Sequence, residues 1–421
     1  MFMFIHAADL HLDSPLLGLA QYEGAPEEAL RGATRRALEN LVHVALEEEV
    51  DFVLIAGDVY DGDWLDHNTG LFFARQMARL RDAKIPVYLI SGNHDAQSVV
   101  TKNLQLPDNV HRFPTNKVAT MHLEDIGVAI HGQGFATRAV TMDLSANYPK
   151  AIPGVYNIGL LHTSLTGYEG HDNYAPCNVE GLKKPGYDYW ALGHIHKQEA
   201  VRVFDPAIWF PGNIQGRHIR ETGPKGCLVV SVDDRASHEV DFRELDVVRW
   251  VEIVMDASRC ATMDECVDDF KDALLKALGT CGERLLAARV VFTGVSQAHG
   301  ELLAQPKRLV GEIRNTANIH GGDQVWIEKV KVRTTAPKSA AEPLDDGPLA
   351  ELAHVIAFMK TDENSLAELA ALLEPLHGKL PAELAEGNGA LGLDQPRRLV
   401  EWLDESDALL RAVGRSLEAG E

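Results

Sequence analysis

The sequence predicts a mixed α/β fold, and three observations support this prediction. Short apolar runs with aromatic and β-branched residues alternate with helical stretches at residues 2–7, 52–56 and 86–90. Such alternation is typical of β-α-β units with parallel strands. The 421 residues suffice for about two or three domains. The 45% hydrophobic and 24% charged residues lie near the average for folded chains, which excludes wholesale disorder.

The elements of the first part follow in order after the opening strand. A helix is predicted from about Pro26 to Glu49, because proline and acidic residues suit its first turn. Further strands are predicted at 127–131, 155–161 and 189–192, and a hairpin-like pair at 200–210 and 226–232. These elements predict a first domain over residues 1–245.

The pattern restarts at Arg249 as a second β-α-β-α-β series. Its strands are predicted at 249–256, 288–292 and 324–332 and its helices at 263–278 and 301–314, within a small α/β domain of residues 246–335. Residues 336–348 are rich in proline, alanine and acids and are typical of a linker. Residues 349–421 carry leucines at helical spacing, which predicts a helical C-terminal segment.

Charge and cysteine content exclude several classes of protein. The 40 Lys+Arg and 62 Asp+Glu residues give a net charge of -22, so a polyanion is not bound through bulk charge attraction. The 5 cysteines form no C-x-x-C pair, which argues against a disulfide framework or thiolate zinc site and indicates the reducing cytoplasm. The N-terminal residues lack the basic start of a secretion signal, and no long apolar run predicts a membrane span or membrane partner.

Five predicted strands end in polar residues of the metal-ligand type. They are Asp9-Leu10-His11, Gly57-Asp58, Gly92-Asn93-His94-Asp95, Leu161-His162 and Gly193-His194-Ile195-His196. In open α/β sheets, binding sites assemble at the edge formed by the carboxyl ends of the strands. Nitrogen and oxygen donors without a thiolate suit Mn²⁺, Fe or Zn²⁺. The donors are too many for one ion but can hold two if Asp58 bridges them. Two ions about 3.5–4 Å apart are typical of phosphoester hydrolysis. The glycines before the donors favour sharp turns and close backbone approach.

These blocks, in this order, resemble the calcineurin-like metallophosphoesterases. The opening ADLHLDSPLLGL, the block AGDVYDGDW and the stretch from Pro211 to Gly226 are similar to SbcD-type DNA repair exonucleases, most of all to their YhaO branch. The resemblance is strong over about residues 1–245. It implies a four-layer α/β/β/α sandwich with a small α/β capping domain and a helical C-terminal segment.

The resemblance also implies a role for each donor. One metal would be held by Asp9, His11, Asp58 and His196, and the other by Asp58, Asn93, His162 and His194. The family usually uses two Mn²⁺ ions. His94 would act on the leaving oxygen of the scissile phosphate, and Asp95 would orient its ring.

Basic and polar residues near the predicted metal edge are candidates for contact with DNA. The expected substrate-binding residues are Arg217, His218 and Asn213, and the neighbouring cations are Arg220, Lys225, Lys183 and Lys184. A solvated surface or a plain turn explains each of them as well. Four further histidines are interpreted as structural: His6, His122, His131 and His171.

The predicted function is a metal-dependent DNA nuclease, an exonuclease with 3′-to-5′ polarity and endonuclease activity expected by similarity. Family analogy gives the C-terminal helices an SbcC-like ATPase as partner, and a homodimer stays open because dimers are frequent in the family. One alternative is a small-substrate phosphodiesterase acting on cyclic nucleotides, although a capping domain favours a larger substrate. Another is a non-catalytic scaffold that docks an ATPase, although the intact donor set argues against it.

Overall fold

The structure is a computed structural model that describes residues 1–14, 24–61, 67–97, 105–165, 175–337, 348–377, 379–380, 391–393 and 395–418. This part of the chain divides into two compact units, residues 1–251 with 283–287 and residues 252–282 with 288–421. Most of the predicted linker at 336–348, and His171, lie outside the described residues. The predicted boundaries at 245 and 335 stay predictions.

The first unit contains two six-stranded sheets. The first sheet has the order β12-β11-β1-β2-β3-β4. Its strands are β1 (Phe2–Ala7), β2 (Phe52–Ala56), β3 (Val87–Ile90), β4 (Val110–Arg112), β11 (Gly226–Val232) and β12 (His238–Glu244). β1 to β4 are parallel, with Phe4 opposite Phe52, and β11 is antiparallel to β1. The buried apolar runs of the sequence therefore form the centre of this sheet.

The second sheet has the order β5-β6-β7-β8-β10-β9. Its strands are β5 (Ala119–Leu123), β6 (Val128–Gly132), β7 (Tyr156–His162), β8 (Tyr189–Gly193), β9 (Glu199–Arg202) and β10 (Ala207–Phe210). β6, β7, β8 and β10 are parallel, and the edge strands β5 and β9 are antiparallel to their neighbours.

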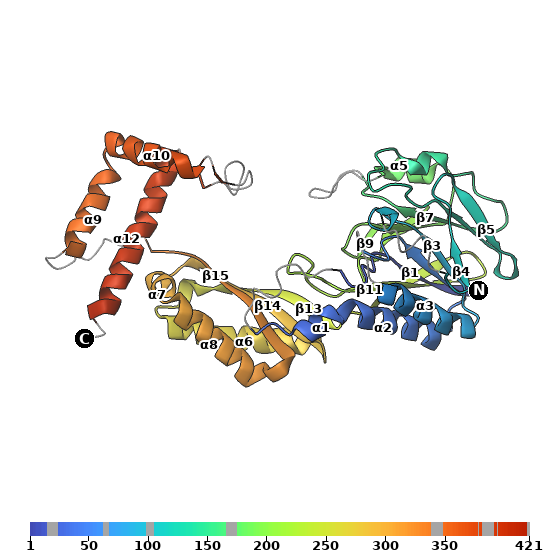
Figure 1. Cartoon of the computed structure of the whole chain (residues 1–421), viewed down its shortest axis with the longest axis horizontal. Helices are drawn as coiled ribbons and strands as arrows, with labels where there is room; N and C mark the ends of the chain where they lie inside the picture. The colour runs from blue at the N-terminus through green and yellow to red at the C-terminus, as the bar shows by residue number, and fades with distance from the viewer. Residues whose placement is uncertain are drawn as a thin grey trace. The chain divides into compact units, whose positions relative to one another are not determined.

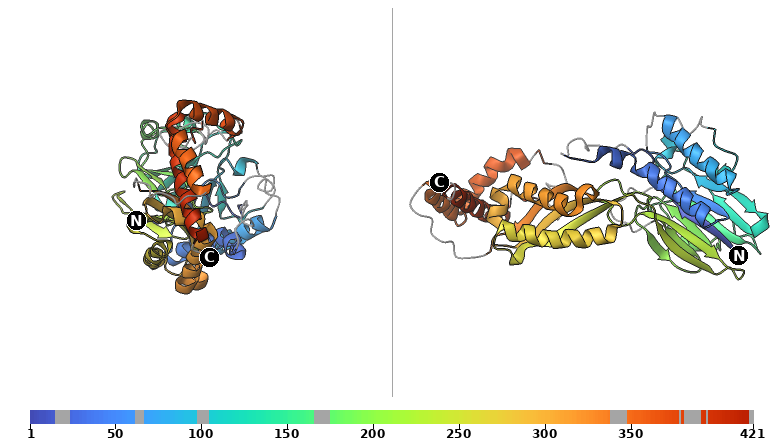
Figure 2. Two further views of the ribbon diagram at one scale, coloured as in Figure 1. Left: turned by 90° about the vertical axis from the view of Figure 1, so that its left-hand side faces the viewer. Right: turned by 90° about the horizontal axis from the view of Figure 1, so that it is seen from below.

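The two sheets pack face to face through aromatic side chains. Phe4 stacks on Phe52 within the first sheet at a centroid distance of 5.0 Å and meets Tyr189 of the second sheet at 5.4 Å. Helices α2 (Ala33–Glu47) and α3 (His67–Asp82) cover the outer face of the first sheet, where Leu38 and Met77 join its apolar core. Helix α5 (Val179–Lys183) covers the second sheet (Figures 1 and 2), and its Leu182 packs with Trp190 and Leu192 on the outer face of that sheet. This confirms the predicted α/β/β/α layers.

Two predictions about local structure differ from the structure. The predicted helix over 26–49 consists of α1 (Glu27–Arg31) and α2, which Gly32 separates. The segments 200–210 and 226–232 do not pair with each other. β9 and β10 form a hairpin in the second sheet, while β11 belongs to the first sheet and forms a hairpin with β12. Both segments form local antiparallel pairs, so the error lies in the choice of partner.

The second unit combines a small sheet with helices. Strands β13 (Val248–Asp256), β14 (Leu285–Val295) and β15 (Val325–Thr335) form a sheet in that order, and β13 and β14 begin within the first unit. Helix α8 (Pro306–Gly321) contacts β15 and α6 (Met263–Cys281). The last described helices are α9 (Pro348–Met359), α10 (Glu363–His377) and α12 (Pro396–Glu418). They share an apolar core of Leu366, Leu399 and Leu403. Among the described residues, no helix is both long and apolar enough to cross a membrane.

Candidate functional site

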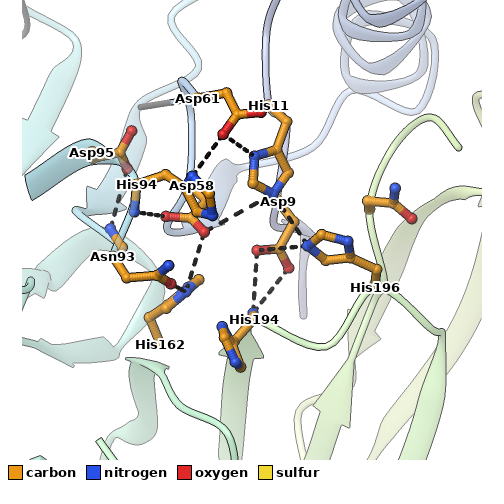
Figure 3. A network of polar contacts seen from close by, with 12 residues as sticks. Asp9, His11, Asp58, Asp61, Asn93, His94, Asp95, His162, His194 and His196 are labelled. Carbon is orange, nitrogen blue, oxygen red and sulfur yellow. Dashed lines mark hydrogen bonds and ion pairs between the residues drawn. The ribbon is translucent and has the colours of Figure 1, made fainter. Parts of the chain in front are cut away.

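The predicted donors meet at one end of the sandwich and come from both sheets (Figure 3). Those of the first sheet follow β1, β2 and β3, and those of the second sheet end or follow β7 and β8. The donors are Asp9, His11, Asp58, Asn93, His162, His194 and His196. Nearly all are buried, whereas the side chain of His196 is 22% exposed and that of neighbouring His94 is 29% exposed. The site therefore opens to solvent on the side of these two histidines.

The backbone at the donors is strained. Asp9, His11, Asp58 and His194 all have positive φ, at 53°, 42°, 52° and 103°. L residues rarely adopt such values, and each instance costs on the order of 1–3 kcal/mol unless the surroundings enforce it. Backbone hydrogen bonds enforce it here, because the Asp9 and His11 N–H groups donate to Gly57 and Asp58 carbonyls, each at 3.0 Å. Strain concentrated at polar residues is typical of a functional site.

Glycines allow the two sheets to approach each other at the site, as predicted. A Cβ on Gly193 would lie 1.9 Å from the carbonyl oxygen of Ala56. A Cβ on Gly57, which has a φ of 93°, would lie 2.5 Å from His162 Nδ1. A Cβ on Gly92 would lie 2.2 Å from Asp58 Oδ1. Any other residue at these positions would push the donors apart.

One group of donors contains Asp9, His11 and His196, whose ligand atoms lie within 4.8 Å of one another. His11 Nε2 and His196 Nε2 are 3.1 Å apart. His196 Nε2 lies 3.9 Å from Asp9 Oδ1, and His11 Nε2 lies 3.9 Å from Asp58 Oδ2. Because His196 donates Nδ1–H to Glu221 at 2.7 Å, Nε2 of the neutral ring carries a lone pair that faces His11.

A second group forms around Asp58 and His162. His162 donates Nδ1–H to the Ala56 carbonyl at 2.9 Å, so Nε2 is the atom that carries a lone pair when the ring is neutral. This atom lies 2.9 Å from Asn93 Oδ1 and 3.4 Å from Asp58 Oδ2. The ring of His194 is edge-on to that of His162 at 5.2 Å, and its backbone N–H donates to Asp9. Within the described ranges, however, His194 belongs to none of the compact donor groups.

This donor set fits divalent cations. Lone pairs of imidazole nitrogens and of carboxylate and amide oxygens point at one another in a buried space, an arrangement that is unfavourable unless a proton or a cation lies between them. Nitrogen and oxygen ligands suit Mn²⁺, Fe and Zn²⁺. Asp58 lies between the two groups and can serve both.

The charges of the site shift its pKa values. Burial acts to raise the pKa of Asp58, but His162 and His94 lower it well below its usual range. Burial acts to lower the pKa of His162, but Asp58 and then Asp9 raise it to about 9. Burial, followed by the charge of Arg217, lowers the pKa of His11. The site therefore keeps Asp58 ionised and His11 neutral, the forms that bind cations, whereas a cation bound at His162 must displace the proton that Asp58 and Asp9 stabilise on its ring.

His94 is oriented by Asp61 and not by Asp95. His94 Nδ1 donates to Asp61 Oδ1 at 2.6 Å, and the His94 backbone N–H donates to Asp58 at 2.9 Å. Asp95 instead accepts the backbone N–H groups of Val59, Tyr60 and Gly92 at 3.1, 2.9 and 3.1 Å. The side chain of Asp95, at the start of the 3-10 turn Asp95–Gln97, therefore points toward the backbone of these residues and not toward the ring of His94. The expected role of Asp95 is thus corrected to a structural one.

Two of the expected substrate-binding residues are engaged in contacts within the protein. Asn213 is 1% exposed, and its amide donates to Gln215 O at 2.7 Å and to Glu221 Oε2 at 3.0 Å. Arg217 pairs with Asp61 at 3.2 Å and with Glu221 at 3.1 Å. Both side chains are therefore held by carboxylate or carbonyl groups of the protein. Glu221, which orients His196, is not among the predicted site residues, although it lies in the stretch from Pro211 to Gly226 that carries the family resemblance.

The remaining candidates divide by exposure. The side chain of His218 is 53% exposed, 3.8 Å from Glu221, while Arg220 and Lys184 are exposed. Lys225 is buried and donates to the His196 carbonyl at 2.6 Å, and Lys183 pairs with Glu180. The predicted basic concentration is therefore largely neutralised or buried.

The histidines interpreted as structural keep that interpretation where they are described. His6 is buried between Tyr189 and the Leu192 carbonyl, each at 3.1 Å, and burial lowers its pKa to about 3. His131 contacts Thr120 and Asn157, and His122 is exposed on β5.

Comparisons with known proteins give consistent matches. Residues 2–198 match the calcineurin-like phosphoesterase family, and residues 250–335 match the middle domain of metallophosphoesterase YhaO. The chain is 34% identical over 340 residues to the metallophosphoesterase YhaO of Bacillus subtilis, an alignment that covers 75% of this chain and 83% of the relative.

Two solved structures also match. A Thermus thermophilus protein gives a TM-score of 0.34 at 13% identity and covers 58% of this chain and 99% of its own. A dimetal phosphatase from Danio rerio gives a TM-score of 0.32 at 12% identity, and the match covers 57% of this chain and 99% of that protein.

Proposed function

Because this chain belongs to the calcineurin-like metallophosphoesterases, we propose that it is a metal-dependent nuclease that hydrolyses phosphodiester bonds in DNA. The observation that carries the proposal is the convergence of the donors on Asp58, beside a partly exposed histidine that is fixed by its own carboxylate.

Two divalent cations, Mn²⁺ by the family resemblance, would be held by the donors. Asp9, His11 and His196 would hold one, and Asn93, His162 and His194 the other, with Asp58 shared between them. When bound, such a pair activates a water nucleophile and offsets the negative charge of the phosphate. The chain fixes the ligand atoms, because the Ala56 carbonyl and Glu221 take the Nδ1 protons of His162 and His196 and leave each Nε2 available.

His94 would donate a proton to the leaving oxygen. It is the half-exposed member of the group of His11, Asp58 and His94, so its ring can reach a substrate on the open side of the site. Asp61 holds Nδ1, which leaves Nε2 to face the substrate. This geometry suits a leaving alkoxide oxygen of a phosphodiester, which needs a proton as its bond to phosphorus breaks.

DNA is proposed as substrate on the similarity of the sequence blocks to SbcD-type exonucleases. By the same similarity, the cleavage would run 3′ to 5′ with endonuclease activity in addition. His218 would contact the DNA, because its side chain is 53% exposed and lies 3.8 Å from Glu221, the carboxylate that orients His196. The five cysteines are all free and buried, which supports action in the reducing cytoplasm.

The C-terminal helices would bind a partner, an ATPase of the SbcC type by resemblance. Helix α9 contributes Ile356 and Met359 to the core of the helical segment. Its Leu352, Val355 and Phe358 are 48%, 52% and 62% exposed. A helix that is apolar on two faces supports the presence of a further protein surface.

The test is cleavage of end-labelled oligonucleotides with Mn²⁺ present. Asp58→Asn and His94→Ala should each abolish cleavage, while the matched control His122→Ala, an exposed histidine on β5, should retain it. Label at the 5′ or the 3′ end reports the polarity. Turnover of cyclic nucleotides or a model diester without any cleavage of DNA would overturn the nuclease in favour of a small-substrate phosphodiesterase.

A further inference from the structure

We infer that Arg217 is a positioning residue that clamps together the two carboxylates orienting His94 and His196. The inference deepens the proposed function, on which it rests, and replaces the expectation that Arg217 grips the DNA backbone. It is carried by a chain of contacts that runs from one histidine to the other through a single guanidinium.

The two ends of the chain are carboxylate–histidine pairs. Asp61 Oδ1 accepts the Nδ1–H of His94 at 2.6 Å, and Glu221 Oε1 accepts the Nδ1–H of His196 at 2.7 Å. Each pair fixes the tautomer and the orientation of its ring, so that the Nε2 atom faces the centre of the site. One ring is the proposed proton donor and the other is a proposed metal ligand.

Arg217 joins the two pairs. Its Nη1 donates to Asp61 Oδ2 at 3.2 Å and its Nη2 donates to Glu221 Oε1 at 3.1 Å. Its backbone N–H donates to Glu221 Oε2 at 2.7 Å. Ser14 adds a further hydrogen bond to Asp61 and lies 3.4 Å from Arg217 Nη1. The planar fork therefore sets the separation of the two carboxylates, and with it the separation of the two rings.

The same contacts leave little of Arg217 for a phosphate. The side chain is only 15% exposed, and its remaining donor, Nε, is buried away from solvent. A phosphate would have to displace two carboxylates that are themselves bonded to histidines. A guanidinium held in this way contributes geometry, and lysine cannot replace it because one ammonium does not present two donors in a fixed plane.

The experiment measures Mn²⁺ binding by titration calorimetry and hydrolysis of two substrates, bis(p-nitrophenyl) phosphate and a labelled oligonucleotide. The variants are Arg217→Lys and Arg217→Gln. The matched control is Arg235→Gln, an exposed arginine in the turn between β11 and β12. Positioning contacts behind metal ligands typically change affinity or activity by about 10- to 100-fold. We expect Mn²⁺ affinity at one of two sites, and kcat on both substrates, to fall within this range, with KM for the oligonucleotide unchanged.

The opposite pattern would overturn the inference. If Arg217 grips phosphate, the loss is confined to the oligonucleotide, KM rises, and the slope of binding against salt falls by about 1, while Mn²⁺ affinity stays intact. Should the protein cleave no DNA, the nuclease proposal fails, but Mn²⁺ affinity and the small diester still decide the role of Arg217.

A double-mutant cycle guards against a general loss of folding. Arg217→Gln combined with Asp61→Asn should lower kcat on the small diester no further than the more damaging of the two single changes, because both break the same clamp. Additive losses would show that the two residues act separately. Arg217→Lys keeps the charge, so it supplies the comparison if Arg217→Gln does not fold.

Discussion

Replacement of Asp61 by asparagine tests whether this carboxylate orients His94. The change removes a charge that lies 2.6 Å from His94 Nδ1 in a setting only 16% exposed. A hydrogen bond to a charged group contributes about 1.5–3 kcal/mol. Because about 1.4 kcal/mol corresponds to a tenfold change in rate, kcat should fall by about 10- to 150-fold.

Asp95→Asn gives the contrasting case, because Asp95 accepts three backbone N–H groups and does not contact the His94 ring. An amide NH₂ would face at least one of these donors, which costs about 1–3 kcal/mol of folding stability. We therefore expect a lower Tm with kcat changed much less than in Asp61→Asn.

The assay is hydrolysis of bis(p-nitrophenyl) phosphate at saturating Mn²⁺, together with thermal unfolding of both variants. A kcat of Asp61→Asn within about twofold of the parent would show that Asp61 does not orient His94. A larger fall of kcat in Asp95→Asn than in Asp61→Asn, without a loss of stability, would show that Asp95 acts on His94 instead.

Three further predictions concern backbone approach, pH and metal. Gly193→Ala places a Cβ 1.9 Å from the Ala56 carbonyl oxygen and should lower the free energy of unfolding by about 3 kcal/mol, which corresponds to a fall in Tm of about 6–12 °C. In the control Gly279→Ala, within α6, the new Cβ meets nothing within 4 Å and should stabilise the protein by about 0.5–1 kcal/mol. Equal Tm values for the two variants would contradict this prediction. Burial lowers the pKa of His6 to about 3 in the folded protein, against 6.5 in the unfolded chain. The stability that depends on neutral His6 is therefore fully present above pH 6.5 and is lost as the pH falls below this value, because only the unfolded chain takes up the proton. Chemical unfolding should show that, between pH 6.5 and pH 5, the free energy of unfolding falls by about 2 kcal/mol more for the parent than for His6→Gln. Equal falls for the two proteins would show that His6 does not cause the pH dependence. Mn²⁺ at about 100 times its Kd should stabilise the parent by about 2.7 kcal/mol but not Asp58→Asn, as a thermal shift with EDTA as blank will show.

The fold was predictable where burial alone decides the structure. The runs at 2–7, 52–56 and 86–90 are buried on both faces and form the parallel centre of the first sheet, as their continuous apolar character predicts. Strand partners are less predictable, because β11 could follow β10 in the same sheet or cross to the other. Its pairing with β1 depends on contacts between residues more than 200 positions apart, and local sequence does not encode such contacts.

In the site, the sequence identified residue types and positions but not side-chain directions. Strand ends indicated Asp9, Asp58 and His162, because parallel strands bring their carboxyl ends to one edge, and a preceding glycine also marked Asp58. Adjacency suggested Asp95 as the partner of His94, whereas the 3-10 turn directs it away and Asp61 takes its place. The position of Asp61 at the end of G-D-V-Y-D was the signal that could have indicated this.

Four donors follow strands of the first sheet and three end or follow strands of the second, so the geometry of the site depends on how the two sheets are aligned. A slip of one sheet past the other by one residue would move one set of donors by about 3.3 Å, enough to break the short contacts between His11 and His196 and between Asn93 and His162. The aromatic rings of Phe4, Phe52 and Tyr189 lock that alignment from the interior. Truncation of one of these distant rings would thus shift the two sets of donors relative to each other and lower activity, although no donor is itself changed.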